Sequence, residues 1–152
     1  GKVMVFHTPT FPDDPLVFRS MWAGFIHEMS MPVTDTILCP MGRPSHVFFD
    51  CFPRFLSEFV MRKKLLTMEE AVRKCTSLPA EVFGIRRRGV VKKGYFADLV
   101  AFDAERLRTR ANFNEPRVHP DGIYHVFVNG RAVVSNGQFR KGTLAGKMIR
   151  KK

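Results

Sequence analysis

The carboxylate in this chain that is best placed to do chemistry is Asp35. It ends the extended, largely apolar segment "MSMPVTD" and stands directly before a loop rich in Pro and Gly. In an α/β barrel, catalytic side chains follow the C-terminal ends of the strands. A loop aspartate that hydrogen-bonds its own backbone gives the same pattern, and on the pattern alone this structural role is the more frequent one.

The remaining residues capable of chemistry form no local motif. HxH, HExxH and HxxxH spacings are all missing among the five histidines, which are His7, His27, His46, His119 and His125. The chain also lacks a GxSxG elbow, a P-loop and a Rossmann glycine pattern. The cysteines are odd in number and lack CxxC spacing, which favours reduced thiols inside a cell; they are Cys39, Cys51 and Cys75.

The length of 152 residues suits one ordinary domain or two small pieces of a larger protein. A formal net charge of +11 is compatible with nucleic acid or an anionic membrane as a partner. The basic residues are, however, spread over many elements without an RNA-binding or zinc-finger pattern. No segment is apolar enough for a membrane span or a signal peptide. We therefore expect a cytoplasmic protein that binds neither nucleic acid nor membrane. The absence of an initiator Met suggests a chain cut from something longer.

Helical patterns dominate residues 1–84. A buried strand is expected at 2–6, a short helix at 16–28 and a loop at 36–47. Asp50 is expected to cap a helix that ends at Lys64, with Pro53 in the first turn. Its apolar stripe consists of Phe52, Phe55, Leu56, Phe59 and Val60. A capping box of Thr67 and Glu70 begins the next helix, whose buried face is expected to contain Met68, Ala71, Val72 and Cys75.

Residues 85–152 alternate as strands do. Residues 89–103 predict two short strands around a Lys-Lys-Gly turn, and residues 122–139 predict a hairpin with Asn129-Gly130 at its turn. Gly137 marks a further turn. We expect Phe127 and Val133 to be buried and the hairpin to pack against the strand that holds Leu99 and Val100. A boundary between two parts is therefore expected near residue 84.

Three stretches, in this order, closely resemble the C-terminal end of the N-acyl-D-amino-acid deacylases (D-aminoacylases) of the amidohydrolase superfamily. They are "LTMEEAVRKCTSLPAEVFGI", "RGVVKKGYFADLVAFD" and "ANFNEPRVHPDGIYHVFVNGRAVVSNGQFRKGTLAGKMIR". The first two are common in the superfamily, and the third is specific to D-aminoacylases. The resemblance implies an α/β fold, with the C-terminal end of a (β/α)8 metal-dependent hydrolase barrel (residues 1–84) followed by part of a small β-sandwich (residues 85–152). In that fold Asp98 accepts hydrogen bonds from backbone N–H groups near a turn.

The resemblance also assigns candidate site residues. "HEMSMPVTDT" lies where the family has a segment whose Asp ends the eighth barrel strand, so Asp35 matches a zinc ligand that also transfers the proton of the attacking water. The family then has a His-Pro-Arg that holds the substrate carboxylate. Here His46 matches the His, but Val47 and Phe48 replace Pro-Arg, which leaves Arg43 or Arg54 as substitutes. The glycine that follows the family Asp is Thr36.

The leading hypothesis from the sequence is a fragment of a zinc-dependent amidohydrolase that is inactive alone. The complete enzyme, with the missing N-terminal barrel portion and its other zinc ligands, would hydrolyse N-acyl-D-amino acids to a carboxylate and a D-amino acid. A non-catalytic remnant or interaction module and a basic nucleic-acid-binding domain remain as alternatives.

Overall fold

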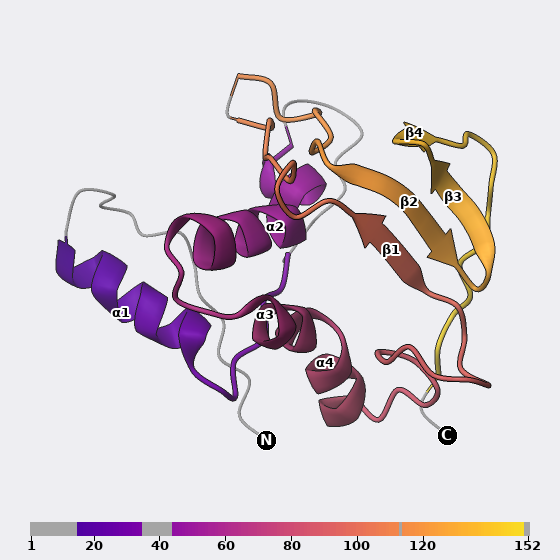
Figure 1. The fold of residues 1–152 in the computed structure, drawn as a ribbon, viewed down its shortest axis with the longest axis horizontal. Coiled ribbons are helices and arrows are strands. Elements are labelled where there is room, and N and C mark those ends of the chain that lie inside the picture. Colours follow the sequence, from indigo (N-terminus) through magenta and orange to yellow (C-terminus); the bar gives the residue numbers. More distant parts are fainter. Residues whose placement is uncertain (1–14, 35–43, 113, 151–152) are drawn as a thin grey trace.

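A computed structural model describes residues 15–34, 44–112 and 114–150 (Figure 1). Helices lie on one side of the molecule, and a four-stranded sheet lies on the other. The helices are α1 (Pro15–Ile26), α2 (Val47–Leu56), the π-helix η1 (Ser57–Arg62), α3 (Met68–Cys75) and α4 (Ser77–Val82). Among the described residues, no helix has the length and apolar character needed to cross a membrane. The strand expected at residues 2–6 lies outside the described residues.

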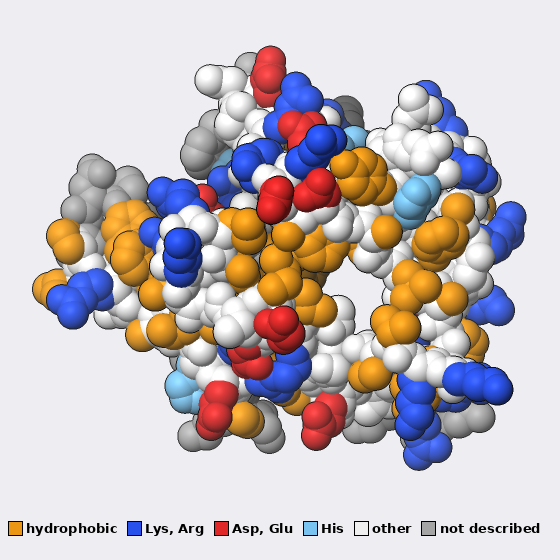
Figure 2. Space-filling model, viewed as in Figure 1, with side chains coloured by type: hydrophobic (Ala, Val, Ile, Leu, Met, Phe, Trp, Pro, Cys, Tyr) orange, Lys and Arg blue, Asp and Glu red, His pale blue; other side chains and the backbone are white. Residues whose placement is uncertain are grey.

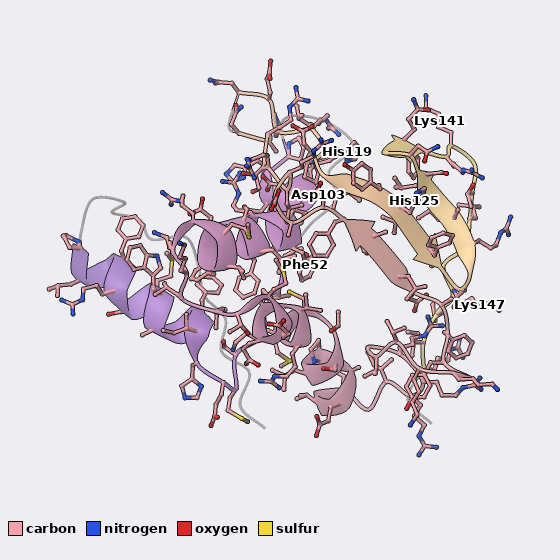
Figure 3. The ribbon with its side chains drawn as sticks, viewed as in Figure 1. Phe52, Asp103, His119, His125, Lys141 and Lys147 are labelled. Carbon is pink, nitrogen blue, oxygen red and sulfur yellow. The ribbon has the colours of Figure 1, made fainter. Side chains whose placement is uncertain are left out.

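The helices share a small aromatic core. Phe55 and Phe59 of the α2–η1 segment are buried together with Ala71 of α3. Phe25 of α1 packs on this pair, with its ring centroid 5.2 Å from that of Phe59. The predicted apolar stripe is confirmed at Phe55 and Phe59. It is wrong at Phe52, which is 40% exposed because it lies on the side of α2 that faces β1 rather than α1 (Figure 3).

The beginning of α2 differs from the prediction. The helix starts at Val47, three residues before Asp50, so Asp50 is a buried residue of the first turn and not the cap. Pro53 consequently lies inside the helix, where it cannot donate the usual backbone hydrogen bond. The backbone then widens into η1, with Lys63 N–H bonded to the carbonyl of Glu58 at 2.9 Å. The spacing predicts a start at Asp50 because Asp is a good capping residue, whereas in the structure Asp50 is buried inside the helix.

The start of α3 is confirmed. Thr67 has extended backbone angles, and its Oγ1 accepts a hydrogen bond from Glu70 N–H at 3.2 Å, as an N-cap does. The Glu70 carboxylate pairs with Arg73 at 2.7 Å. On the buried face Ala71 is fully buried, while Met68, Val72 and Cys75 are half-buried.

The four strands form an antiparallel meander in the order β1-β2-β3-β4. They are β1 (Leu99–Phe102), β2 (Ile123–Val128), β3 (Arg131–Ser135) and β4 (Gln138–Phe139). The predicted hairpin is confirmed: Asn129 and Gly130 have φ of 50° and 80°, as a type I′ turn requires, and Leu99 of β1 pairs with Phe127 of β2. Asn136 and Gly137 form the next turn with φ of 52° and 75°. The expected burial of Phe127 and Val133 is wrong, however: both are half-buried, and no residue of the four strands is fully buried.

The expectation of two strands within residues 89–103 is wrong for the first of them. Residues 85–98 form turns and bends, and only Leu99–Phe102 is a strand. Positive φ angles at Arg87, Gly89 and Gly94 interrupt extended backbone there. Arg87 Nε closes this loop by donating to the carbonyl of Gly94 at 2.9 Å.

Asp98 ends the same loop and serves as the predicted acceptor. Its Oδ1 accepts the N–H of Asn129 at 2.7 Å. Arg88 bonds both the Asp98 carboxylate and, at 2.5 Å, Oδ1 of Asn129. These contacts join the loop to the hairpin turn.

Candidate functional site

Two of the four predicted site residues, Asp35 and Arg43, lie outside the described residues, and Arg54 lies on α2. The fourth, His46, directly precedes α2. The chain on the other side of this interval, residues 30–34, has no regular secondary structure, so the described part of the segment expected to be the last barrel strand is not a strand. The thiol of Cys51 on α2 lies 3.8 Å from the carbonyl oxygen of Val33. The first turns of α2 therefore lie beside the segment that precedes Asp35.

A polar cluster on one face of α2 consists of His46, Asp50 and Arg54, at successive positions four residues apart. Asp50 is fully buried, and its Oδ2 lies 2.6 Å from Arg54 Nη2. Its Oδ1 lies 3.8 Å from His46 Nδ1. Arg54 Nη2 also donates to the carbonyl of Ala111 at 2.9 Å, which fixes α2 to the loop between β1 and β2. The Nη2 group of Arg54 is thus paired within the molecule, with Asp50 and with Ala111.

The same end of α2 meets the loop that leads into β2. The rings of Phe49 and His119 make an edge contact, with centroids 5.6 Å apart. Figure 3 shows His119 beside α2, whereas His125 and Lys141 lie on the sheet away from the helices. Of the two histidines in residues 85–152, His119 thus lies beside α2 and His125 does not.

The turn that precedes residues 30–34 is held from α3. Lys74 is fully buried, and its Nζ donates to the carbonyl of His27, to the carbonyl of Ser30 at 3.2 Å and to Ser30 Oγ at 3.1 Å. Arg73 Nη2 donates to the carbonyl of Glu28 at 3.1 Å. Burial lowers the pKa of Lys74, opposed by the nearby Glu70 carboxylate. Two neighbouring basic residues therefore fix one turn of the backbone.

The thiols near this site are poor nucleophiles and poor metal ligands. Burial raises the pKa of Cys75 to about 12. Burial also raises the pKa of Cys51, and the neighbouring Asp50 carboxylate adds to the effect. Since the thiolate is the reactive and ligating form, both side chains remain protonated at neutral pH, and Cys51 can act as the S–H donor to Val33.

A zinc ion would need further ligands. Within residues 15–34, 44–112 and 114–150, no three His, Cys, Asp or Glu side chains are grouped so as to hold a metal. A catalytic zinc site has about three protein ligands and one open position. The described side chains on their own therefore do not fit a zinc ion.

Comparison with known proteins decides the family. The profile of the amidohydrolase family matches residues 31–134, which is more than half of the chain. This chain belongs to the amidohydrolase family. It is 42% identical over 109 residues to the N-acyl-D-glutamate deacylase of Alcaligenes xylosoxydans xylosoxydans, a match that covers 72% of this chain and 22% of that relative.

Solved structures agree with this assignment. A D-aminoacylase studied for its binuclear metal centre aligns with a TM-score of 0.77 and 36% identity, over 88% of this chain and 27% of the other. An N-acyl-D-glutamate deacylase from Bordetella bronchiseptica, complexed with zinc and a phosphonate mimic of the tetrahedral intermediate, aligns with a TM-score of 0.70 and 36% identity over 80% of this chain and 26% of that one. The chain thus spans about a quarter of the length of these enzymes, and the resemblance to D-aminoacylases is confirmed.

Sequence reasoning missed two buried charged residues, Asp50 and Lys74. Asp50 was interpreted as a cap because it precedes Pro53. Lys74 was passed over, although it occupies the helical position three residues after Ala71 and four before Leu78, both of which are buried. A lysine at a core position of an apolar pattern is the signal that could have revealed it.

Proposed function

We propose that this chain is the part of a zinc-dependent N-acyl-D-amino-acid deacylase that carries its proton-transferring carboxylate, Asp35. The observation that carries the proposal is the 42% identity to an N-acyl-D-glutamate deacylase, together with the alignment to a zinc-bound deacylase structure. The complete enzyme hydrolyses the amide bond of an N-acyl-D-amino acid and releases a carboxylate and a free D-amino acid.

In this proposal Asp35 accepts a proton from the attacking water and passes it to the nitrogen of the leaving amino group. Zinc, when bound in the complete enzyme, supplies Lewis-acid activation of the water and of the amide carbonyl. His46 and Arg43 remain the candidates for binding the substrate. His46 has support from its place at the start of α2, since residues 30–34 run beside that helix.

The proposed partner of this chain is the N-terminal portion of the barrel. The support is apolar surface between the helices and the sheet (Figure 2), together with exposed large side chains on α2 and β1: Phe52 is 40% exposed, and Leu99 and Val100, which point to opposite faces of the sheet, are 37% and 55% exposed. Such surface is costly in water and typical of an interface. The isolated chain is expected not to hydrolyse N-acetyl-D-glutamate with or without added zinc, as assayed by release of free amine.

A chimera tests the proposal directly. Residues 1–152 replace the matching part of the Alcaligenes N-acyl-D-glutamate deacylase, and hydrolysis of N-acetyl-D-glutamate is measured in the zinc-loaded protein. We expect measurable turnover that Asp35→Asn removes almost completely, because an amide neither takes the proton nor balances the metal charge. Glu69→Gln, the same change at an exposed position of α3, should have no effect. A folded, zinc-loaded chimera without turnover would support a non-catalytic remnant instead.

We also propose that the chain does not bind nucleic acid specifically. Several of its arginines are engaged within the molecule, as in the pairs Arg62–Glu58, Arg73–Glu70 and Arg88–Asp98. Titration with labelled duplex and single-stranded oligonucleotides at physiological salt should show no sub-micromolar, sequence-dependent affinity. A steep loss of tight binding as salt rises would point to the nucleic-acid-binding alternative.

A further inference from the structure

Lys74 is, with Asp50, one of two charged residues among those described that are fully buried, and it is the only lysine of the two. Lysine is rarely fully buried without a partner, and removing an ammonium group from water is costly. Leucine or methionine at this core position would fill similar space without that cost. The amine must therefore provide something that an apolar side chain cannot, namely directed hydrogen-bond donors.

Those donors converge on one turn of the chain. The three donors of Lys74 Nζ match three oxygen atoms, the carbonyls of His27 and Ser30 and the hydroxyl of Ser30. Ser30 Oγ in turn lies 2.9 Å from the carbonyl of Phe25 and 2.8 Å from that of His27, so its single hydroxyl proton is directed back into the end of α1. The buried ammonium group of Lys74 thus bonds both ends of the turn, at His27 and at Ser30.

The turn leads directly into the segment that precedes Asp35. Only residues 31–34 separate Ser30 from Asp35, and consecutive Cα atoms are about 3.8 Å apart. Within these four residues the contact of Cys51 with the carbonyl of Val33 is a second fixed point. Ser30 and Val33 are therefore the two described anchor points of the chain that leads to Asp35.

We propose that Lys74 is a positioning residue for the reaction: its ammonium group fixes the turn of residues 27–30 and thereby sets the place of the chain that presents Asp35. The inference rests on the proposed function, which assigns the proton transfer to Asp35. Lys74 itself touches neither substrate nor metal in this role. It acts through the backbone, by the same logic by which outer hydrogen bonds orient catalytic groups in other enzymes.

The first experiment needs no catalysis and uses the chain as it is. Amide hydrogen exchange is followed by NMR in Lys74→Met, which keeps the volume but removes the donors. Among residues 28–34, the amides of Met29 and Ser30 hydrogen-bond to His27 and should exchange at least about tenfold faster, while those of the β2–β3 hairpin keep their rates. Lys93→Met, the same change at an exposed turn position, should alter neither region. Unchanged exchange at 28–34 would overturn the anchoring role.

Lys74→Met is a core substitution that can prevent folding altogether, so two milder variants accompany it. Lys74→Arg retains a charged donor and should restore slow exchange at 28–34 at least in part. Ser30→Ala removes one of the three acceptors and should accelerate exchange less than Lys74→Met does. Faster exchange in Lys74→Arg than in Ser30→Ala would show that bulk at this position, and not hydrogen bonding, controls the turn.

The second experiment measures kcat and KM in the zinc-loaded chimera. Misplacement of a catalytic group by about 1 Å costs about 100-fold in rate, so Lys74→Met should lower kcat by about 10- to 100-fold with little change in KM. Lys74→Arg should recover part of the loss, and Lys93→Met should leave both constants unchanged. A variant that folds poorly contains less active enzyme. Each rate is therefore divided by the titrated concentration of zinc-loaded sites, so that kcat refers to folded enzyme only.

The two proposals fail in different ways. If Asp35→Asn abolishes turnover and Lys74→Met leaves kcat unchanged, the positioning role is wrong and the proposed function stands. If Asp35→Asn retains full turnover, the proposed function is wrong, and with it the catalytic role of Lys74, whatever the exchange experiment shows. Parallel losses in kcat for both variants support both proposals.

Discussion

Residues 47–82, which we call the helical region, bury four apolar side chains between their helices: Phe55, Phe59, Ala71 and Leu78. In the sheet region, residues 99–139, no strand residue reaches that degree of burial, and β1 is exposed along most of its length. Leu107 and Ala111 are buried in the loop between β1 and β2, while the strands are joined by ladder hydrogen bonds and by the polar contacts of Arg88, Asp98 and Asn129 at one end. The helical region therefore contains its own core, whereas the sheet is one layer that lacks a second apolar layer to cover it.

The chain that leads to Asp35 is held by the region that contains the buried core. The segment next to Asp35 is fixed by Lys74 and Cys51, which both lie on core helices. The loop between β1 and β2 joins the helical region through the bond of Arg54 to Ala111 and the ring contact of Phe49 with His119. We infer that the helical region positions the candidate site and that the sheet mainly stabilises the joint.

The largest expected effect tests whether the helical region holds the main core. Phe59→Ala removes a buried aromatic side chain and should lower the free energy of unfolding by about 3–5 kcal/mol. Phe127→Ala, on the half-buried β2, should cost less than half as much. Urea unfolding followed by circular dichroism measures both. Equal losses would mean that the two regions share one core.

The next effect tests the joint between the regions. Arg54→Met leaves the fully buried Asp50 carboxylate without its ion-pair partner, which should cost about 3 kcal/mol. The double variant Asp50→Leu/Arg54→Met removes both charges and should recover most of that loss, since an apolar pair avoids desolvation. The same urea titration applies. If the double variant were less stable than Arg54→Met, the charges would be supporting the joint through more than their mutual attraction.

The two regions also differ in how much the sequence revealed. In the sheet region the turn chemistry is local: Asn129-Gly130 and Asn136-Gly137 favour positive φ, and both turns formed where predicted. Burial was overestimated there, because alternation predicts which face a side chain occupies but not whether anything covers that face. Phe127 is the example.

In the helical region the apolar stripe and the Thr67 cap were readable from spacing, while Asp50 and Lys74 were not. The partners of Lys74 come from a distant segment, the turn at residues 27–30, while Asp50 pairs with Arg54 on its own helix, and Arg54 is in turn bonded to the distant Ala111. Such pairings depend on tertiary structure and leave little trace in local pattern. The role of Asp35 came from the resemblance, and its position lies outside the described residues.

A smaller effect concerns the polar end of the sheet. Burial opposes ionisation of Asp98, but hydrogen bonds from Asn129 N–H and Arg88 outweigh it and hold the pKa of Asp98 below its usual value. In acid the unfolded chain therefore binds more protons than the folded chain. The stabilisation of the folded state by ionised Asp98 is complete above the unfolded pKa of about 3.9, and it is lost as pH falls through the pKa of Asp98 in the folded chain. Asp98→Asn should cost about 1 kcal/mol at pH 7, a modest figure because the carboxylate is 33% exposed. Unfolding measured from pH 7 to 3 should show less acid sensitivity in the variant than in the unchanged chain.

The smallest effect separates the turn from the packing around it. Gly130 has φ of 80°, and a Cβ there would meet no atom within 4 Å, so Gly130→Ala should cost only the left-handed backbone strain of about 1 kcal/mol. Gly122 has a similar φ of 86°, but its Cβ would lie 2.7 Å from Leu107 N, in the loop that contacts α2. Gly122→Ala should therefore cost clearly more. Urea midpoints of the two variants measure the difference, and equal midpoints would show that the loop at Leu107 yields freely, so that the helical region does not hold it in place.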